Sequence, residues 1–173
     1  MILLKLLLLG IAWHTQTSIY TISIPAIDSS TIDFSAFQGK KILIVNTAEN
    51  SDSVAQYGEL EQLYQLYKDS LVIIACPTGN FTQEVYTNNE INTFIAGNYN
   101  AHYLIAAQLY VNGTGISPLY QWLTDITQNG AMYGHVDNDF QKYLVDSNGN
   151  IIGVFDKTVS PLSQDIQNAI TQN

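Results

Sequence analysis

The sequence predicts an α/β fold in which a central mixed sheet carries helices on both faces. Two apolar runs, Ile42–Val45 and Leu71–Cys76, have the length and composition of buried strands. Between them, Ser53–Lys68 repeats its apolar and tyrosine residues at helical spacing. Strand, helix and strand in this order predict two parallel strands joined by a crossover helix. Later, Asp146–Gly149 separates two short β-forming segments, which predicts a hairpin.

The remaining elements follow from periodicity and from turn residues. We expect a β-hairpin over Ile19–Phe37 with its turn at Asp28–Ser30, a helix over Asn89–Ala96, a helix opened by Pro118 that buries Leu119, Trp122, Leu123 and Ile126, strands over Asp139–Val145 and Ile151–Phe155, and a closing helix that buries Leu162, Ile166 and Ile170. A βαβ unit, a hairpin and a closing helix make a thioredoxin-like three-layer sandwich.

Composition indicates one packed domain and excludes some partners. The chain has 173 residues, of which 46% are hydrophobic and only 12% charged, which argues against disorder. Its net charge is −9, and all six of its basic residues are lysines. Nucleic-acid binding by phosphate neutralisation is therefore not expected. Without arginine, the chain also has no bidentate clamp for a carboxylate or a phosphate.

Residues 1–18 are typical of a secretory signal. A lysine precedes an apolar run that ends near Trp13, and this run is too short to span a bilayer. We therefore expect export to the periplasm or the extracellular space, no stable membrane anchor, and a mature domain over residues 19–173. Cleavage would remove Lys5 and no acidic residue, so the net charge of −9 would become −10. The alternative is a buried N-terminal strand or helix.

The loop after the first core strand is the predicted functional site. Reactive groups in α/β sheets commonly follow the carboxyl ends of strands. Here that position holds Asn50, Ser51 and Asp52. The chain has a single cysteine, Cys76, so it forms no internal disulfide.

Several short motifs carry a family resemblance. Val45-Asn46-Thr47-Ala48 followed by Gln56-Tyr57 is similar to VN-x-A-S-x-C-G-x-T-x-Q-Y, and residues 77–84 (PTGNFTQE) are similar to P-C-N-Q-F-G-x-Q-E with one residue fewer. Gly39-Lys40, Val111-Asn112-Gly113, Pro118-Leu119-Tyr120 and Phe140–Asp146 match further blocks in the same order. From residue 22 onward the chain thus resembles the glutathione peroxidase family, which implies a thioredoxin-like fold, thiol-dependent reduction of peroxides and a role in the response to oxidative stress.

The departures from that family bear on function. Aligned on these motifs, the family's peroxidatic cysteine or selenocysteine falls on Ser51, its glutamine on Asn80, and its Trp-Asn pair on Asn138 and Asp139. A serine hydroxyl is not ionised near neutral pH, and nearby aspartates disfavour a developing negative charge. The resemblance therefore implies a member that has lost peroxidase activity and acts as a binding or structural module. The sequence indicates no cofactor and identifies no partner, and glutathione, an anion, is not expected to bind.

Three alternatives remain. Cys76 lies one position from the family's cysteine in P-C-N-Q and would serve a residual or altered thiol peroxidase or oxidoreductase, although cysteine in an apolar strand is usually buried. His102 or His135 with Asp137, Asp139 or Asp52 would make a metal site, but their spacing matches no ligand template, so no metal is expected. Ser51 would act in a hydrolase, but the chain lacks the G-x-S-x-G motif.

Overall fold

The computed structural model describes residues 16–81 and 86–172. Within them lies a five-stranded mixed sheet in the order β5-β4-β3-β6-β7. Strands β3, β4 and β5 are parallel, whereas β6 runs antiparallel to β3, and β7 antiparallel to β6. The strands of the sheet are β3 (Lys41–Thr47), β4 (Leu71–Pro77), β5 (Leu104–Ile105), β6 (Lys142–Val145) and β7 (Ile151–Phe155), and a separate hairpin contains β1 (Ser23–Pro25) and β2 (Thr31–Asp33).

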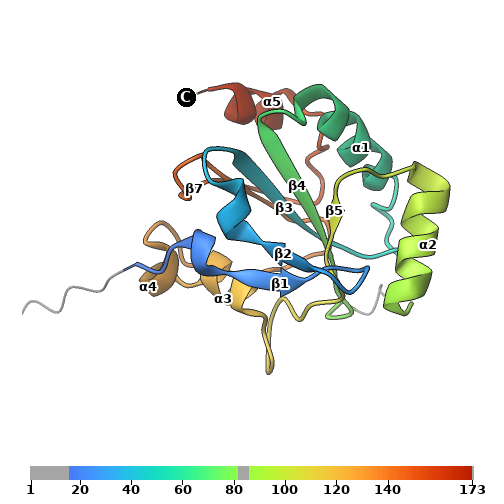
Figure 1. Ribbon diagram of the computed structural model, residues 1–173, viewed down its shortest axis with the longest axis horizontal. Helices are drawn as coiled ribbons and strands as arrows, with labels where there is room; N and C mark the ends of the chain where they lie inside the picture. Colours follow the sequence, from blue (N-terminus) through green and yellow to red (C-terminus); the bar gives the residue numbers. More distant parts are fainter. Residues whose placement is uncertain (1–15, 82–85, 173) are drawn as a thin grey trace, which may run out of the picture.

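Two layers cover the sheet (Figure 1). Helices α1, α2 and α5 pack on one face, and α3 and the β1–β2 hairpin pack on the other. The helices are α1 (Gln56–Tyr67), α2 (Asn88–Tyr99), α3 (Pro118–Thr124), α4 (Ile126–Asn129) and α5 (Gln164–Thr171), with short 3-10 helices η1 (Ile19–Thr21) and η2 (Phe34–Phe37) beside the hairpin. The predicted three-layer arrangement is therefore present.

The central strand β3 supplies both cores. Ile42 and Ile44 face the hairpin side, whereas Leu43 and Val45 face α1. Both faces of the strand are covered, which explains its continuous apolar run. Strands β3 and β4 are parallel and in register from Lys41↔Leu71 onward, so they end at the same edge of the sheet. The loops that follow them consequently lie next to one another, and the Thr78 amide donates to the Thr47 carbonyl at 3.0 Å.

Helix α1 begins three residues later than expected. The Ser53–Lys68 prediction placed its start in a segment that instead forms successive turns, in which Val54 N–H donates to Ser51 O and Gln56 N–H donates to Ser53 O. The tyrosine stripe of the helix belongs to the core: Tyr57, Leu60 and Leu63 are buried, and Tyr64 and Tyr67 are partly buried against them.

Strand β6 is shorter than the predicted Asp139–Val145. It begins at Lys142, because Phe140 has a φ of 53° and so leaves the extended conformation. The Phe140 ring is completely buried, and its amide donates to the Asn46 carbonyl. Packing of this ring thus fixes the backbone where an extended strand was expected.

The predicted burial of Ile126 was wrong. Helix α3 ends at Thr124, and the Asp125 side chain accepts a hydrogen bond from the Thr127 amide, which starts the separate helix α4. Ile126 is therefore the first residue of a new helix and is 47% exposed. The other predicted apolar residues of this segment, Leu119, Trp122 and Leu123, are buried.

The hairpin closes one border of the sheet. Its turn lies at Asp28–Ser30, as predicted, with Ser29 in the left-handed region at a φ of 73°. Beyond β1, Ala26 pairs with Ala106, and the Ile27 amide donates to the Ile105 carbonyl at 3.0 Å. Strand β5 has only two residues and was not predicted, because a segment this short carries no periodic pattern.

The predicted signal segment falls largely on residues 1–15, which lie outside the described residues. Thr17, near the expected cleavage point, is tied to the domain: its amide donates to Gln128 O at 3.0 Å, and its carbonyl accepts from Trp122 Nε1 at 2.6 Å. In residues 16–81 and 86–172, no helix combines the length and the apolar character needed to cross a bilayer.

Candidate functional site

Ser51 lies where the sequence placed it, in the loop beyond the carboxyl end of β3. The residue is only 7% exposed. Its Oγ accepts a hydrogen bond from the Ser53 amide at 2.9 Å, which fixes the hydroxyl inside the turn that precedes α1. The Ser51 hydroxyl thus stabilises the local turn.

The next residue, Asp52, belongs to a three-residue ion cluster with Lys157 and Asp139. Lys157 Nζ lies 3.1 Å from Asp52 Oδ1 and 3.8 Å from Asp139 Oδ1. The hydrogen bond with Asp52 raises the pKa of Lys157, and the lysine in turn lowers the pKa of Asp52. A lysine that remains protonated between two carboxylates is not a general base. Lys157 therefore neutralises the two carboxylates and does not take a proton from the Ser51 hydroxyl.

A hydrogen bond with the end of β3 positions the segment that contains Asn138 and Asp139. The Asn46 side chain donates from Nδ2 to the Asn138 carbonyl at 2.6 Å, which ties the segment before β6 to the end of β3. Asp139 is 4% exposed, whereas Asn138 is half-buried. The structure thus connects Asp139 through Lys157 to Asp52, the residue after Ser51, and Asn138 directly precedes Asp139 in the chain.

Asn80 lies at the same edge of the sheet but has other partners. Its Oδ1 accepts from Val111 N–H at 2.8 Å and from Thr78 Oγ1 at 3.0 Å, and its Nδ2 donates to Asn112 O at 3.4 Å. Among the residues that the structure describes, its side chain makes no hydrogen bond with Ser51 or Asp139. Asn80 therefore anchors the 111–112 segment.

Sequence reasoning missed two site residues, Lys157 and Glu49. Strand β7 runs in the same direction as β3, because each is antiparallel to β6. A residue directly after β7 consequently lies at the same edge as Ser51, and topology would have identified Lys157. Glu49, two residues before Ser51, is 5% exposed. It follows buried Ala48 and precedes exposed Asn50, and no pattern in the sequence pointed to it.

Cys76 is completely buried in β4. Burial raises the pKa of its thiol to about 12, against a small opposing effect of a hydrogen bond with Tyr120. Thiolates rather than thiols are nucleophilic, so at neutral pH Cys76 is held in its unreactive thiol form. The geometry gives Cys76 the character of a core residue.

The two histidines within the described residues, His102 and His135, have structural contacts. The Nδ1 atom of His102 lies 2.9 Å from Glu61 Oε1, and its backbone amide donates to Glu61 Oε2 at 2.7 Å. The His135 ring packs edge-on against Tyr133. Across the described part of the chain, no three His, Cys, Asp or Glu side chains are grouped so as to hold a metal ion.

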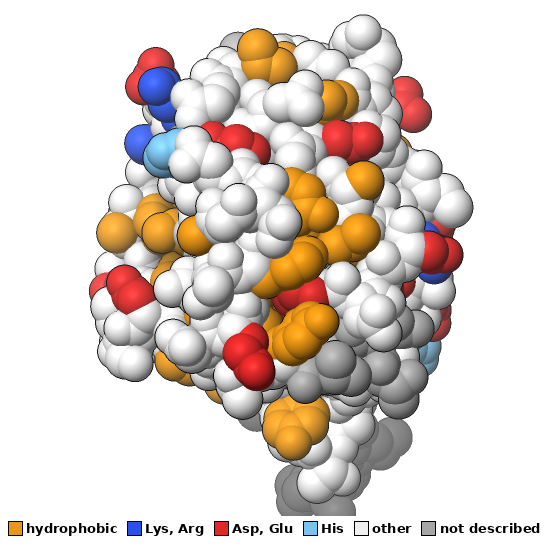
Figure 2. All heavy atoms as spheres, turned by 90° about the vertical axis from the view of Figure 1, so that its right-hand side faces the viewer, with side chains coloured by type: hydrophobic (Ala, Val, Ile, Leu, Met, Phe, Trp, Pro, Cys, Tyr) orange, Lys and Arg blue, Asp and Glu red, His pale blue; other side chains and the backbone are white. Residues whose placement is uncertain are grey.

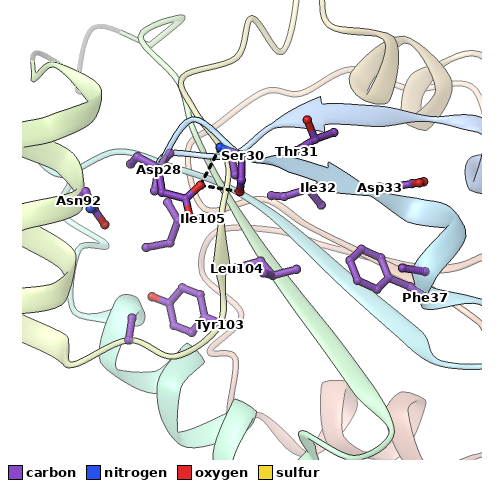
Figure 3. Close-up of a pocket in the computed structure, with 14 residues that line it drawn as sticks. Asp28, Ser30, Thr31, Ile32, Asp33, Phe37, Asn92, Tyr103, Leu104 and Ile105 are labelled. Carbon is purple, nitrogen blue, oxygen red and sulfur yellow. Dashed lines mark hydrogen bonds between the residues drawn. The ribbon is translucent and has the colours of Figure 1, made fainter.

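A groove of about 590 Å³ lies away from Ser51, between the hairpin, β5 and α2 (Figure 3). Its walls combine apolar side chains such as Ile32, Phe37 and Leu104 with the carboxylate of Asp28. That carboxylate already accepts from the amide of Ser30 at 2.9 Å and from its hydroxyl at 2.6 Å. None of the four predicted site residues lines this groove.

Comparison with known proteins agrees with this architecture. The family model for glutathione peroxidase matches residues 19–124. A glutathione peroxidase of Lactococcus lactis is 34% identical over 144 residues, which cover 82% of this chain and 91% of the relative. The chain is also similar to the crystal structure of Trgpx in its apo form, with a TM-score of 0.69, 27% identity, and coverage of 91% of this chain and 98% of that one.

The fold itself extends to more distant proteins. A thiol:disulfide interchange protein of the thioredoxin family from Chlorobium tepidum superimposes with a TM-score of 0.63 at 13% identity, over 90% of this chain and 94% of that one. The predicted thioredoxin-like fold is therefore confirmed. Both the matched residues and the sequence identity lead to one conclusion: the chain belongs to the glutathione peroxidase family.

Proposed function

We propose that this chain is a family member that has lost thiol peroxidase activity and acts as a binding or structural module. One observation carries the proposal: the sole sulfhydryl group of the sequence is Cys76, which is completely buried and has a pKa raised to about 12. Peroxide reduction needs a thiolate or selenolate that can reach the O–O bond.

The surroundings of Ser51 support the same proposal. The position that the family resemblance assigns to the nucleophile holds a hydroxyl that accepts a hydrogen bond from the Ser53 amide. Beside it, Asp139 is buried and Asp52 is paired with Lys157, so negative charge already occupies the place where an anion would have to be stabilised. Lys157 is engaged by both carboxylates.

A coupled peroxidase assay tests the proposal. We expect the purified chain to reduce neither hydrogen peroxide nor an organic hydroperoxide above the blank, with either glutathione or a thioredoxin-type reductant. Turnover at the rate of an ordinary family member would overturn the proposal, and its loss in Cys76→Ser would assign the activity to that thiol. Ser51→Cys is the matched control, because it returns a sulfur atom to the same loop without changing the core.

We further propose that the chain is exported. The support is the charge and apolar pattern of residues 1–18. N-terminal sequencing of the protein recovered from its own cells would test this. An N-terminus between residues 15 and 20 in the exported fraction is the expected result, and an intact Met1 in a cytoplasmic fraction would contradict it.

A further inference from the structure

Glu49 is a nearly completely buried acid in the loop that carries Ser51. It is 5% exposed and lies just beyond β3. Its Oε1 accepts a hydrogen bond from the Tyr57 hydroxyl at 2.7 Å. Its Oε2 has no hydrogen-bond partner among the described residues. The loop therefore buries a carboxyl oxygen that water would otherwise solvate.

The groups that face this carboxyl are phenols. Tyr57 comes from α1, Tyr99 from α2, and Tyr103 from the segment between α2 and β5, and each has its pKa raised in part by the charge that Glu49 would carry. No ion pair within the described residues joins Glu49 to a lysine or histidine. An ionised Glu49 would thus be a buried charge with no cation beside it, stabilised only by the Tyr57 hydroxyl and its own backbone amide.

Such a charge is costly in the closed loop. An ionised carboxylate loses several kcal/mol of hydration on burial unless it is paired. Accordingly, burial raises the pKa of Glu49, and the hydrogen bond from Tyr57 opposes this effect only in part. In the closed loop the acid is therefore held in its neutral form beyond the range where an exposed glutamate would ionise.

We propose that Glu49 is a proton-operated latch: as a neutral acid it keeps the 47–52 loop closed, and on ionisation it opens the loop to water. The latch is connected to the rest of the site through Tyr57. The Tyr57 ring lies 5.4 Å from Tyr99 and 5.3 Å from Phe140, centroid to centroid, and Phe140 follows Asp139 directly. Opening therefore displaces Ser51 and loosens the packing beside Asp139.

The direction of the pH effect follows from linkage. The closed loop binds the Glu49 proton more tightly than the open one, because the pKa of the buried group lies above its ordinary value of 4.5. The closed state is consequently fully favoured below about pH 4.5, and its advantage falls as the pH rises through the pKa of the closed state. This behaviour does not depend on whether peroxidase activity is absent.

Two measurements on the full chain test the latch together. Carboxyl ¹³C NMR, assigned with Glu49→Gln, reports the ionisation of this group. Hydrogen exchange at amides 48–57, corrected for the intrinsic effect of pH, reports opening. We expect Glu49 to titrate above pH 4.5, and protection of these amides to fall with the same midpoint. In Glu49→Gln the protection should stay constant over that range.

Two further variants test whether the measured titration belongs to Glu49 and its hydrogen bond with Tyr57. Tyr57→Phe removes the hydrogen bond that favours the ionised form, so it should move the Glu49 midpoint to higher pH. Glu90→Gln is the control, because Glu90 is an exposed glutamate whose pKa is lowered by the α2 capping box, and it should leave that midpoint unchanged. A carboxyl that titrates at or below pH 4.5 would overturn the proposal. A fall in amide protection in Glu49→Gln that matches the wild type would also overturn it. The proposal would fail as well if the Glu49 midpoint changed between Na⁺ and K⁺ buffers, because a bound cation would then compensate the charge of the carboxylate.

Discussion

At the scale of single residues, Cys76 decides which chemistry the chain supports. It lies opposite Asn46 in the parallel pairing of β3 and β4, within a core cluster that also contains Tyr120 and Trp122. A thiol with no exposed surface reacts only when the strand separates from its neighbours. Its reactivity is therefore a measure of unfolding.

We predict that Cys76 is not alkylated in the native protein. Iodoacetamide at pH 8 should modify it in 6 M guanidinium within minutes and leave it unmodified without denaturant over hours, because the thiol is buried and its pKa is raised to about 12. Mass spectrometry measures the added group. Rapid alkylation of the native wild-type protein would contradict the prediction.

The site shows how far single residues can be predicted. Motif spacing indicated the loop after β3 for Ser51 and Asp52, and in the structure Asp139 approaches Asp52 through their shared partner Lys157. The spacing gave no signal for Lys157, whose contribution depends on the direction of β7, nor for the partners of Asn80, which come from a loop with no regular pattern. Long-range side-chain contacts of this kind follow from topology, which periodicity alone does not contain.

At the scale of elements, helix α5 depends on a lysine from the central strand. Lys41 Nζ donates to the carbonyl oxygens of Ala169 at 3.0 Å and Ile170 at 2.8 Å, and also to that of Gln172. These carbonyls belong to the last turn of α5, which has no further helical partners and carries the negative end of the helix dipole. One side chain thus satisfies several groups at once.

Lys41→Met should destabilise the protein by about 1–2 kcal/mol, because it leaves these carbonyls without their charged donor. Urea unfolding followed by circular dichroism measures the loss. The neighbouring Lys40 is exposed, so Lys40→Met is the matched control and should change the free energy of unfolding by less than about 0.5 kcal/mol. Equal effects of the two substitutions would exclude a specific role for the Lys41 contacts.

Elements with strong periodicity were predicted well, and short ones were not. The strands β3, β4 and β7 and the helix α2 lie close to where their patterns indicated, whereas α1 begins three residues late and α5 begins after Leu162, which its pattern included. Errors arose at α4 and β5, which have four and two residues, and at the start of β6, where the packed Phe140 ring overrides extended propensity. Boundaries thus depend on capping and packing, which act across the fold.

At the scale of the whole molecule, stability depends on pH through a buried lysine and a buried glutamate. Lys142, on β6, is completely buried, and its Nζ donates to Phe140 O at 2.8 Å and Asp156 O at 3.4 Å. Burial lowers its pKa to about 8, whereas buried Glu49 has its pKa raised. Each group therefore shifts the balance of folding in a different pH range.

The free energy of unfolding should rise by about 2 kcal/mol between pH 8 and pH 10. In this range the folded protein releases the Lys142 proton before the unfolded chain does, so the cost of burying the charge, which is full below pH 8, disappears. Urea titrations at several pH values measure this. Lys142→Met should remove the rise, and the same rise in that variant would assign it to another group. Measurements stop at pH 10, above which buried tyrosines with raised pKa values, such as Tyr57 and Tyr120, favour unfolding.

The charge of the molecule disfavours small anions. The net charge is −9 without a single arginine, and on the face around α2 acidic side chains are spread widely while lysines lie only near the edges (Figure 2). At the candidate site, Lys157 is already engaged by Asp52 and Asp139. Glutathione is anionic, so the negative potential of the molecule would repel it, and no free cation lies beside Ser51 to bind it.

Isothermal titration calorimetry should therefore detect no glutathione binding at physiological salt. Asp52→Asn, which frees Lys157 from one partner, is the informative variant, and a gain of weak binding there would show that charge is the obstacle. A sub-millimolar site in the wild-type chain would refute this expectation.

The two borders of the sheet differ in a way that limits self-association. The hairpin meets β5 through the Ala26–Ala106 bridge, whereas β7 is an edge strand on which Ile152 and Val154 are 46% and 39% exposed. A filament built by strand addition needs two open edges on each subunit. Among the described strands only β7 offers a long one, so pairing through it would join two copies and then terminate.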